Sequence, residues 1–243
     1  MSIIYKENQL LPFITNDKLF SAVEKIFFKV KNTVQSDKNF YKNAVDPFSA
    51  LFDASSSGIT LEQWVKLEKT RQRQKTLQNT IGEFHEEIIG GVDGWERLPV
   101  GKLIDVKCDH RKIIGEIKNK HNTTKGSDRK DQYDNLEYAL NNTYPGYTAY
   151  FVETIPKNRA KYNKEFTPSD NKLSTNRVKN EMIRVIDGGS FYELVTGDRF
   201  ALIKLYRVLP LVIRDILEVE KLPDYNSELL FHELFAKAFD YNI

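Results

Sequence analysis

The chain has one cysteine, Cys108, among its 243 residues. A single thiol cannot form an internal disulfide or build a zinc site from cysteines, and such usage is typical of a reducing compartment. Long hydrophobic runs are also missing, because no stretch approaches the roughly 20 apolar residues of a membrane span. The N-terminus, MSIIYKENQLLPF, lacks the charged-then-apolar pattern of a signal peptide. These absences argue against a disulfide scaffold and a membrane protein, and they predict a cytoplasmic protein.

Neither sign of charge dominates, since the net charge is only +2, but the charges are unevenly distributed. Residues 102–130 hold nine Lys/Arg against four acids, and residues 157–184 hold eight against three, so each segment carries +5. The tail from residue 215 carries −5, from seven acids and two lysines. Basic segments interleaved with polar residues suit a phosphate backbone, where each neutralised phosphate releases a counterion. A solvated surface explains the same charges without a partner.

The apolar spacing changes from helical to strand-like along the chain. Residues 17–32 are apolar at helical spacing, and Thr60 with Gln63 forms a capping-box pattern that predicts a helix from there to Ile89. Two short β-branched runs, LIDVKCD and KIIGEIK, then predict an antiparallel hairpin. The remaining expected elements are a helix at DQYDNLEYALNN, strands at GYTAYFVETIP and IRVIDG, and helix over residues 190–217. This order predicts a mixed α/β layer fold, with a central sheet flanked by helices and a helical N-terminal part.

The hairpin also carries the charged residues that point to chemistry. Glu116 and Lys118 are two apart on the second strand, so their side chains project from the same face. Antiparallel pairing brings Asp105 of the first strand opposite them. Two carboxylates in a partly dry site repel each other, and a hard divalent cation relieves that repulsion. We therefore predict a magnesium site, with manganese as a substitute, held by Asp105, Glu116 and the carbonyl of Ile117.

A lysine beside such a metal can orient or deprotonate the attacking water, while the metal lowers the pKa of that water and stabilises charge on a phosphate. Lys118 occupies this position. The predicted reaction is hydrolysis of a phosphodiester bond.

Asp105 followed by Glu116-Ile117-Lys118 resembles the D…(D/E)-x-K signature of the PD-(D/E)XK nuclease superfamily. Ile104 stands where the usual proline would precede the aspartate. More specifically, TIGEFHEEIIGGVDGW, LIDVKCD and GEIKNKHNTTKGSDRKDQYDNL, within residues 77–155, resemble a family of type II restriction endonucleases that recognise GGNCC.

This resemblance implies a PD-(D/E)XK restriction-endonuclease-like core and magnesium-dependent, site-specific cleavage of double-stranded DNA. It further implies a cognate DNA methyltransferase in the same system. Because GGNCC is two-fold symmetric apart from its central base pair, a homodimer is expected. The apolar helices at residues 17–32 and 198–217 are candidates for its interface or for the core. A repair or recombination nuclease of the same fold and an inactive DNA-binding protein remain alternatives.

The helix before the hairpin offers further acids. Glu83 is a candidate additional catalytic acid, as a helix-borne glutamate is in several families with this fold, and an ordinary surface position is equally compatible with its sequence. Glu86 and Glu87 are expected to be solvated. His85 is a candidate metal ligand or DNA contact, although a lone histidine between apolar residues is more often structural.

The loop after the catalytic strand is rich in small hydrogen-bonding side chains and basic residues, which suit phosphate contacts. The predicted DNA-binding residues are Lys120, Asn122, Thr123, Thr124, Lys125, Ser127 and Arg129. Guanine is most often read by Arg or Lys, so the candidates for base contacts are Arg159, Lys161, Lys164, Lys172, Arg177 and Lys179. Gln132 and Tyr133 are expected either to approach the DNA strand that is cut or to pack inside the protein. We expect a helical N-terminal region over residues 1–76, packed on a nuclease core over residues 77–243 within one structural domain.

Overall fold

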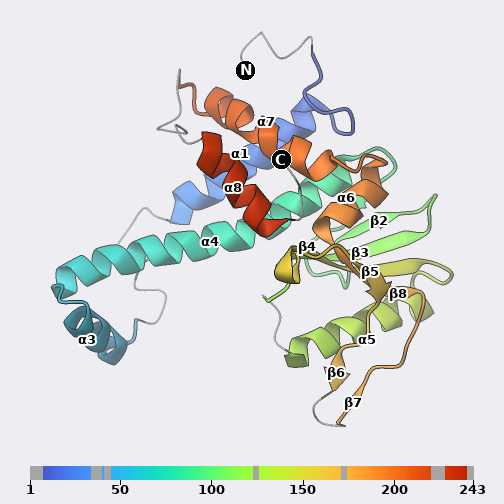
Figure 1. Cartoon of the computed structure of the whole chain (residues 1–243), viewed down its shortest axis with the longest axis horizontal. Coiled ribbons are helices and arrows are strands. Elements are labelled where there is room, and N and C mark those ends of the chain that lie inside the picture. Colours follow the sequence, from blue (N-terminus) through green and yellow to red (C-terminus); the bar gives the residue numbers. More distant parts are fainter. Residues whose placement is uncertain are drawn as a thin grey trace.

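The computed structural model describes residues 8–33, 40, 45–122, 126–170, 174–219 and 228–239 (Figure 1). Its central sheet has six strands in the order β1-β2-β3-β4-β8-β5, with helices on both faces. The strands are β1 (Glu96–Arg97), β2 (Val106–Cys108), β3 (Ile113–Lys120), β4 (Thr148–Ile155), β5 (Asn163–Glu165) and β8 (Ile183–Asp187). Two short strands, β6 (Ser169–Asp170) and β7 (Thr175–Asn176), pair separately. The predicted mixed α/β layer fold is confirmed.

The expected hairpin is present, with β2 and β3 antiparallel and Val106 opposite Gly115. The strands β3, β4 and β8 then run parallel to one another. Lys118 on β3 is in register with Glu153 on β4, which is in register with Asp187 on β8. Because the carboxyl ends of parallel strands meet at one edge of a sheet, this edge collects charged side chains.

Alternation along the strands divides the interior into two cores. On one face, Ile114 and Phe151 pack with Leu136 of α5 (Gly126–Asn142), the helix that connects β3 to β4. Residues two apart on a strand share a face, so Glu116 and Lys118 continue the face of Ile114 beyond the end of the apolar packing. The sequence thus places the acid and the lysine where the core gives way to polar surroundings.

The opposite face carries the larger core, in which Ile117 and Val152 are buried together with Phe84 and Phe191. Its helices are α1 (Asn16–Thr33), α4 (Leu61–Gly91), α6 (Gly188–Thr196), α7 (Ala201–Ile216) and α8 (Glu228–Ala238). Both apolar segments considered for a dimer interface, residues 17–32 and 198–217, contribute side chains to this core.

The helix α4 has 31 residues and begins at the predicted capping box, where Gln63 N–H donates to Thr60 Oγ1 and Thr60 N–H donates to Gln63 Oε1. It ends at Gly91, two residues beyond the predicted end. Its N-terminal half extends beyond the sheet, and α3 (Pro47–Ser56) packs near its start around Trp64 (Figure 1). The helix passes residue 76 without a break, and the proposed division there stays a prediction.

Within the described residues, no helix is both long enough and apolar enough to cross a membrane.

Candidate active site

The Asp105 side chain is held against the end of β3 by the backbone. Asp105 directly precedes β2, one residue short of the strand in which the sequence predicts it. Its N–H donates to the Gly115 carbonyl at 2.9 Å, and its Oδ2 accepts from the Ile117 N–H at 2.6 Å. The N–H and C=O of one strand residue point to the same side of the strand. The Ile117 carbonyl, the third predicted metal ligand, therefore faces the side on which Asp105 lies.

Glu116 and Lys118 are neighbours on the same face of β3, as their spacing predicts. Lys118 Nζ donates to Glu116 Oε1 at 2.5 Å. The side chain of Glu116 is 9% exposed and that of Lys118 is 30% exposed, so the pair lies at the border of the core. The structure therefore brings together all three residues of the Asp105, Glu116 and Lys118 signature.

This site concentrates negative charge in a poorly solvated place. Burial, together with the nearby Glu116 carboxylate, raises the pKa of Asp105 to about 7. Burial also raises the pKa of Glu116, although Lys118 opposes that change. Burial alone would lower the pKa of Lys118, but Glu116, Asp105 and Glu86 together outweigh burial and the pKa rises. A single ammonium thus faces two carboxyl groups, and burial disfavours the charged form of both. A divalent cation would relieve that cost.

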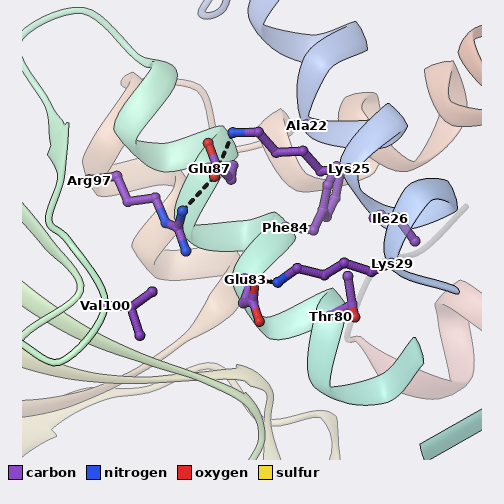
Figure 2. A pocket seen from close by; sticks show the side chains of 10 residues that line it. All are labelled: Ala22, Lys25, Ile26, Lys29, Thr80, Glu83, Phe84, Glu87, Arg97 and Val100. Atoms are coloured by element: carbon purple, nitrogen blue, oxygen red, sulfur yellow. Dashed lines mark hydrogen bonds and ion pairs between the residues drawn. The ribbon is translucent and has the colours of Figure 1, made fainter. Parts of the chain in front are cut away.

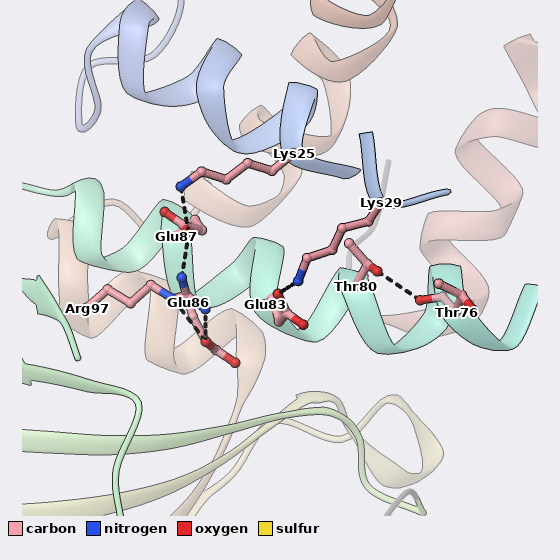
Figure 3. A network of polar contacts seen from close by, with 8 residues as sticks. All are labelled: Lys25, Lys29, Thr76, Thr80, Glu83, Glu86, Glu87 and Arg97. Carbon is pink, nitrogen blue, oxygen red and sulfur yellow. Dashed lines mark hydrogen bonds and ion pairs between the residues drawn. The ribbon is translucent and has the colours of Figure 1, made fainter. Parts of the chain in front are cut away.

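A third acid near this site comes from α4, and it is Glu86. Figure 3 shows Glu86 pointing toward the strands, whereas Glu83 and Glu87 reach the lysines of α1. Burial and the charge of Asp105 raise the pKa of Glu86. Its Oε2 accepts from Arg97 Nε at 3.0 Å and from Arg97 Nη2 at 2.8 Å. The expectation that Glu86 is solvated is wrong, since its side chain is only 15% exposed.

Glu83, the acid singled out from the sequence, lies about 60° around the axis of α4 from Glu86, toward α1. It forms an ion pair with Lys29 and lines a cavity of about 280 Å³ between α1 and α4 (Figure 2). Phe84 and Ile26 also line this cavity. Its lining includes none of Asp105, Glu116 and Lys118. Glu83 and Glu87 lie about 60° and 100° around the helix axis from Glu86. The packing of the helix therefore decides which of the three faces the strands.

His85 is a partly buried structural residue. Its Nδ1 lies 2.8 Å from the Tyr192 hydroxyl oxygen, and burial lowers its pKa to about 4. A neutral, partly buried ring that contacts Tyr192 supports the structural interpretation more than a metal ligand or a DNA contact.

Among the predicted DNA contacts, Arg129 has an internal role. Its guanidinium pairs with Glu153 of β4 and lies 5.3 Å from the ring centroids of both Phe151 and Phe166. Glu153 Oε2 also accepts from the Tyr162 hydroxyl at 2.5 Å. Arg129 therefore joins α5 to the sheet, and its predicted contact with DNA stays a prediction.

The structure describes only some of the other predicted DNA-contact residues. Thr123, Thr124 and Lys125 lie outside the described residues, as does the side chain of Ser127. Lys120 and Asn122 lie at the end of β3 and just after it.

The candidate base readers differ in how exposed they are. Arg177 pairs with Asp134 at 2.8 Å and with Asp170 at 3.3 Å. Lys172 lies outside the described residues. The side chains of Arg159, Lys161, Lys164 and Lys179 are exposed. Tyr133 is buried and its hydroxyl donates to the Val178 carbonyl, so it packs internally.

Comparison of the sequence with known proteins identifies the family of this chain. The family model for the Eco47II restriction endonuclease matches residues 11–218. The chain belongs to the Eco47II restriction endonuclease family. The type II restriction enzyme Eco47II of Escherichia coli is 40% identical over 234 residues, covering 95% of this chain and 97% of that protein. The type II restriction enzyme Sau96I of Staphylococcus aureus is 32% identical over 238 residues, covering 95% and 90%.

This member of the Eco47II family is thus a type II site-specific deoxyribonuclease, and enzymes of this class generally use divalent metal ions. Within the described ranges, no group of three or more His, Cys, Asp and Glu side chains is arranged to hold an ion. The donors at hand are two carboxylates and one main-chain carbonyl, all of them oxygens. Such an open set fits an ion like Mg²⁺, which keeps several waters of its own.

For this Eco47II-family enzyme, we expect Glu86→Gln to lower the cleavage rate by about 10- to 100-fold, the cost of losing an outer-shell group at a metal site. Glu83→Gln is the matched control, because it changes the same residue type three positions away on the same helix. Its cleavage rate should remain within about two-fold of wild type, since Glu83 forms only a partly exposed ion pair. Single-turnover cleavage of plasmid DNA measures both rates. Equal losses in the two variants would contradict the assignment of Glu86.

Proposed function

We propose that this enzyme cleaves both strands of duplex DNA at GGNCC, that it uses Mg²⁺, and that it works as a homodimer. The observation that carries the proposal is the convergence of Asp105, Glu116 and Lys118 at the end of β3, with the Ile117 carbonyl facing the same side. The GGNCC site rests on the resemblance of residues 77–155 to endonucleases that recognise this sequence. We further propose that it acts in the cytoplasm beside a cognate DNA methyltransferase.

In this proposal, Asp105, Glu116 and the Ile117 carbonyl hold the metal, which supplies an activated water and stabilises charge on the phosphate. The Ile117 N–H fixes the direction of the Asp105 carboxylate at 2.6 Å. The Lys118 ammonium is held beside Glu116 at 2.5 Å and stays protonated there. It therefore orients the attacking water and stabilises the charge on the scissile phosphate. Because it is already protonated, it is poorly suited to accept a proton from that water.

The homodimer follows from the symmetry of the site. GGNCC is two-fold symmetric apart from its central base pair, so two subunits related by the same axis can each read one GG half and cut one strand. The exposed basic residues at positions 159–179 are candidates for reading guanine. Loss of one bidentate contact to guanine should cost about 1–3 kcal/mol of discrimination against the wrong base.

The test is incubation of plasmid DNA with the protein and Mg²⁺, followed by sequencing of the ends. Sedimentation of the protein on its DNA should accompany the digest. The expected result is cleavage at GGNCC with two subunits bound to each duplex. Scattered ends without a symmetric consensus, or one subunit on each cleaved duplex, would favour a repair or recombination nuclease. Tight binding without cleavage would instead favour an inactive DNA-binding protein.

A further inference from the structure

The middle of α4 is basic. From Lys69 to Gly82 it contains four basic residues and no acid, whereas Glu68 and Glu83 flank the segment on either side. The N-terminal half of α4 extends beyond the sheet on the side where β3 ends and α5 begins (Figure 1). The carbonyl of Gln78 accepts from Asn119 Nδ2 at 3.3 Å, which ties the segment to the end of β3, one residue beyond Lys118.

One face of this segment is continuous with the face that carries Glu86. At 3.6 residues per turn, Gly82, Asn79 and Lys75 lie about 40°, 20° and 20° around the helix axis from Glu86. Asn79 and Lys75 are exposed. The rise from Glu86 to Lys75 is about 16 Å, which corresponds to roughly five base-pair steps of duplex DNA.

Gly82, on the same face of the helix, is a second reason to expect a ligand here, and this reason does not depend on charge. A glycine inside a helix destabilises it relative to alanine. A Cβ built on Gly82 would meet no described atom within 4 Å, so the packing of the described chain does not require the missing side chain. The position resembles places where a backbone must admit a close-approaching ligand.

We propose that the face of α4 formed by Glu86, Gly82, Asn79 and Lys75 is a track for one sugar-phosphate strand of the DNA, leading into the cleavage site. This inference rests on the proposed function and adds to it a contact surface outside the predicted loop. Lys75 neutralises a phosphate, Asn79 donates to a phosphate or sugar oxygen, and Gly82 lets the strand pass close to the helix backbone. Because these contacts are to the backbone, they act equally on all DNA sequences.

The opposite face of the same helix supplies the controls. Arg73 is exposed and lies about 140° around the axis from Glu86. Thr70 is also exposed and lies about 160° away. Arg73→Ala therefore matches Lys75→Ala in the charge that it removes, and Thr70→Leu matches Gly82→Leu in the side chain that it introduces.

The experiment measures binding to two fluorescein-labelled duplexes of 30 base pairs, with and without GGNCC, over a range of KCl concentrations in EDTA. It also measures the cleavage rate of the first duplex in Mg²⁺ and the Tm of each variant. Lys75→Ala should weaken binding to both duplexes several-fold and reduce the slope of log K against log salt by about one. Gly82→Ala should raise the Tm yet weaken binding, and Gly82→Leu should weaken it about ten-fold or more. Arg73→Ala and Thr70→Leu should bind within about two-fold of wild type.

A loss of binding together with a gain of thermal stability at position 82 cannot come from misfolding. The track would be overturned if Lys75→Ala and Gly82→Leu bind and cut as wild type does, or if Arg73→Ala loses as much affinity as Lys75→Ala. A wild-type protein that neither binds nor cuts either duplex would overturn the proposed function, and the track with it.

Discussion

Asp105→Asn and Glu116→Gln are each expected to reduce the rate of DNA cleavage by on the order of 10³-fold. Each change removes a charge from the proposed metal site while keeping the size of the side chain. The amide introduced by Asp105→Asn also retains an oxygen that can accept from the Ile117 N–H. DNA binding should stay within a few-fold of wild type, because these acids contribute no attraction to phosphate. Single-turnover cleavage and binding in EDTA measure the two effects separately.

Asp109→Asn is the control, because Asp109 follows β2 in the same hairpin but pairs with Lys107 at the exposed surface. It should cleave at nearly the wild-type rate. Cleavage by Asp105→Asn at the wild-type rate would show that the metal lies elsewhere.

The same substitution at position 105 should also stabilise the protein without metal. Folding raises the pKa of Asp105 from 3.8 to about 7, so the folded state favours the protonated acid. The stability of the metal-free wild type is therefore expected to fall as the pH rises from about 4 to about 7, and Asp105→Asn should lose that part of the decline. Values of Tm in EDTA at pH 5 and pH 8 test this.

Removal of divalent ions is the second large effect. Excess EDTA should abolish cleavage, and Mg²⁺ or Mn²⁺ added beyond the chelator should restore it. Calcium should support binding without cleavage. Oxygen donors from two carboxylates and one carbonyl favour hard cations, and the open site leaves room for the waters that Mg²⁺ retains.

A stability measurement gives this prediction a readout besides activity. Mg²⁺ should raise the Tm of the wild-type protein, because binding to the folded state alone stabilises it and relieves the repulsion between Asp105 and Glu116. The rise should be much smaller in Asp105→Asn. Undiminished cleavage in excess EDTA would rule out the metal-dependent mechanism.

The sequence predicts the centre of the site well, because that part depends on local rules. Strand alternation places Glu116 and Lys118 on one face, and a tight hairpin brings Asp105 beside them. Pairing across the hairpin needs only about ten residues of chain, so the pattern of apolar residues defines it almost completely. The two later strands are predictable from their β-branched apolar runs.

Contacts between distant segments were harder to predict. Whether Glu83 or Glu86 faces the strands depends on the rotation of α4, which is determined by Arg97 and by the lysines of α1. Arg129 looks like a phosphate contact in a basic loop, yet Glu153 lies 24 residues away in the sequence and pairs with it. Neither the orientation of Glu86 nor the pairing of Arg129 can be predicted from the spacing of nearby residues, because both depend on how the helices pack on the sheet.

The uninterrupted course of α4 restricts how the length of this region can change during evolution. Trp64 is buried against α3 at one end of the helix, and Phe84 is buried in the main core near the other. One inserted or deleted residue between them would turn one of these anchors by about 100° relative to the other. Insertions of seven residues, two turns with a mismatch of about 20°, would keep both anchored. Variation in chain length among members of the family should therefore occur in the loops, and this helix should change by substitution.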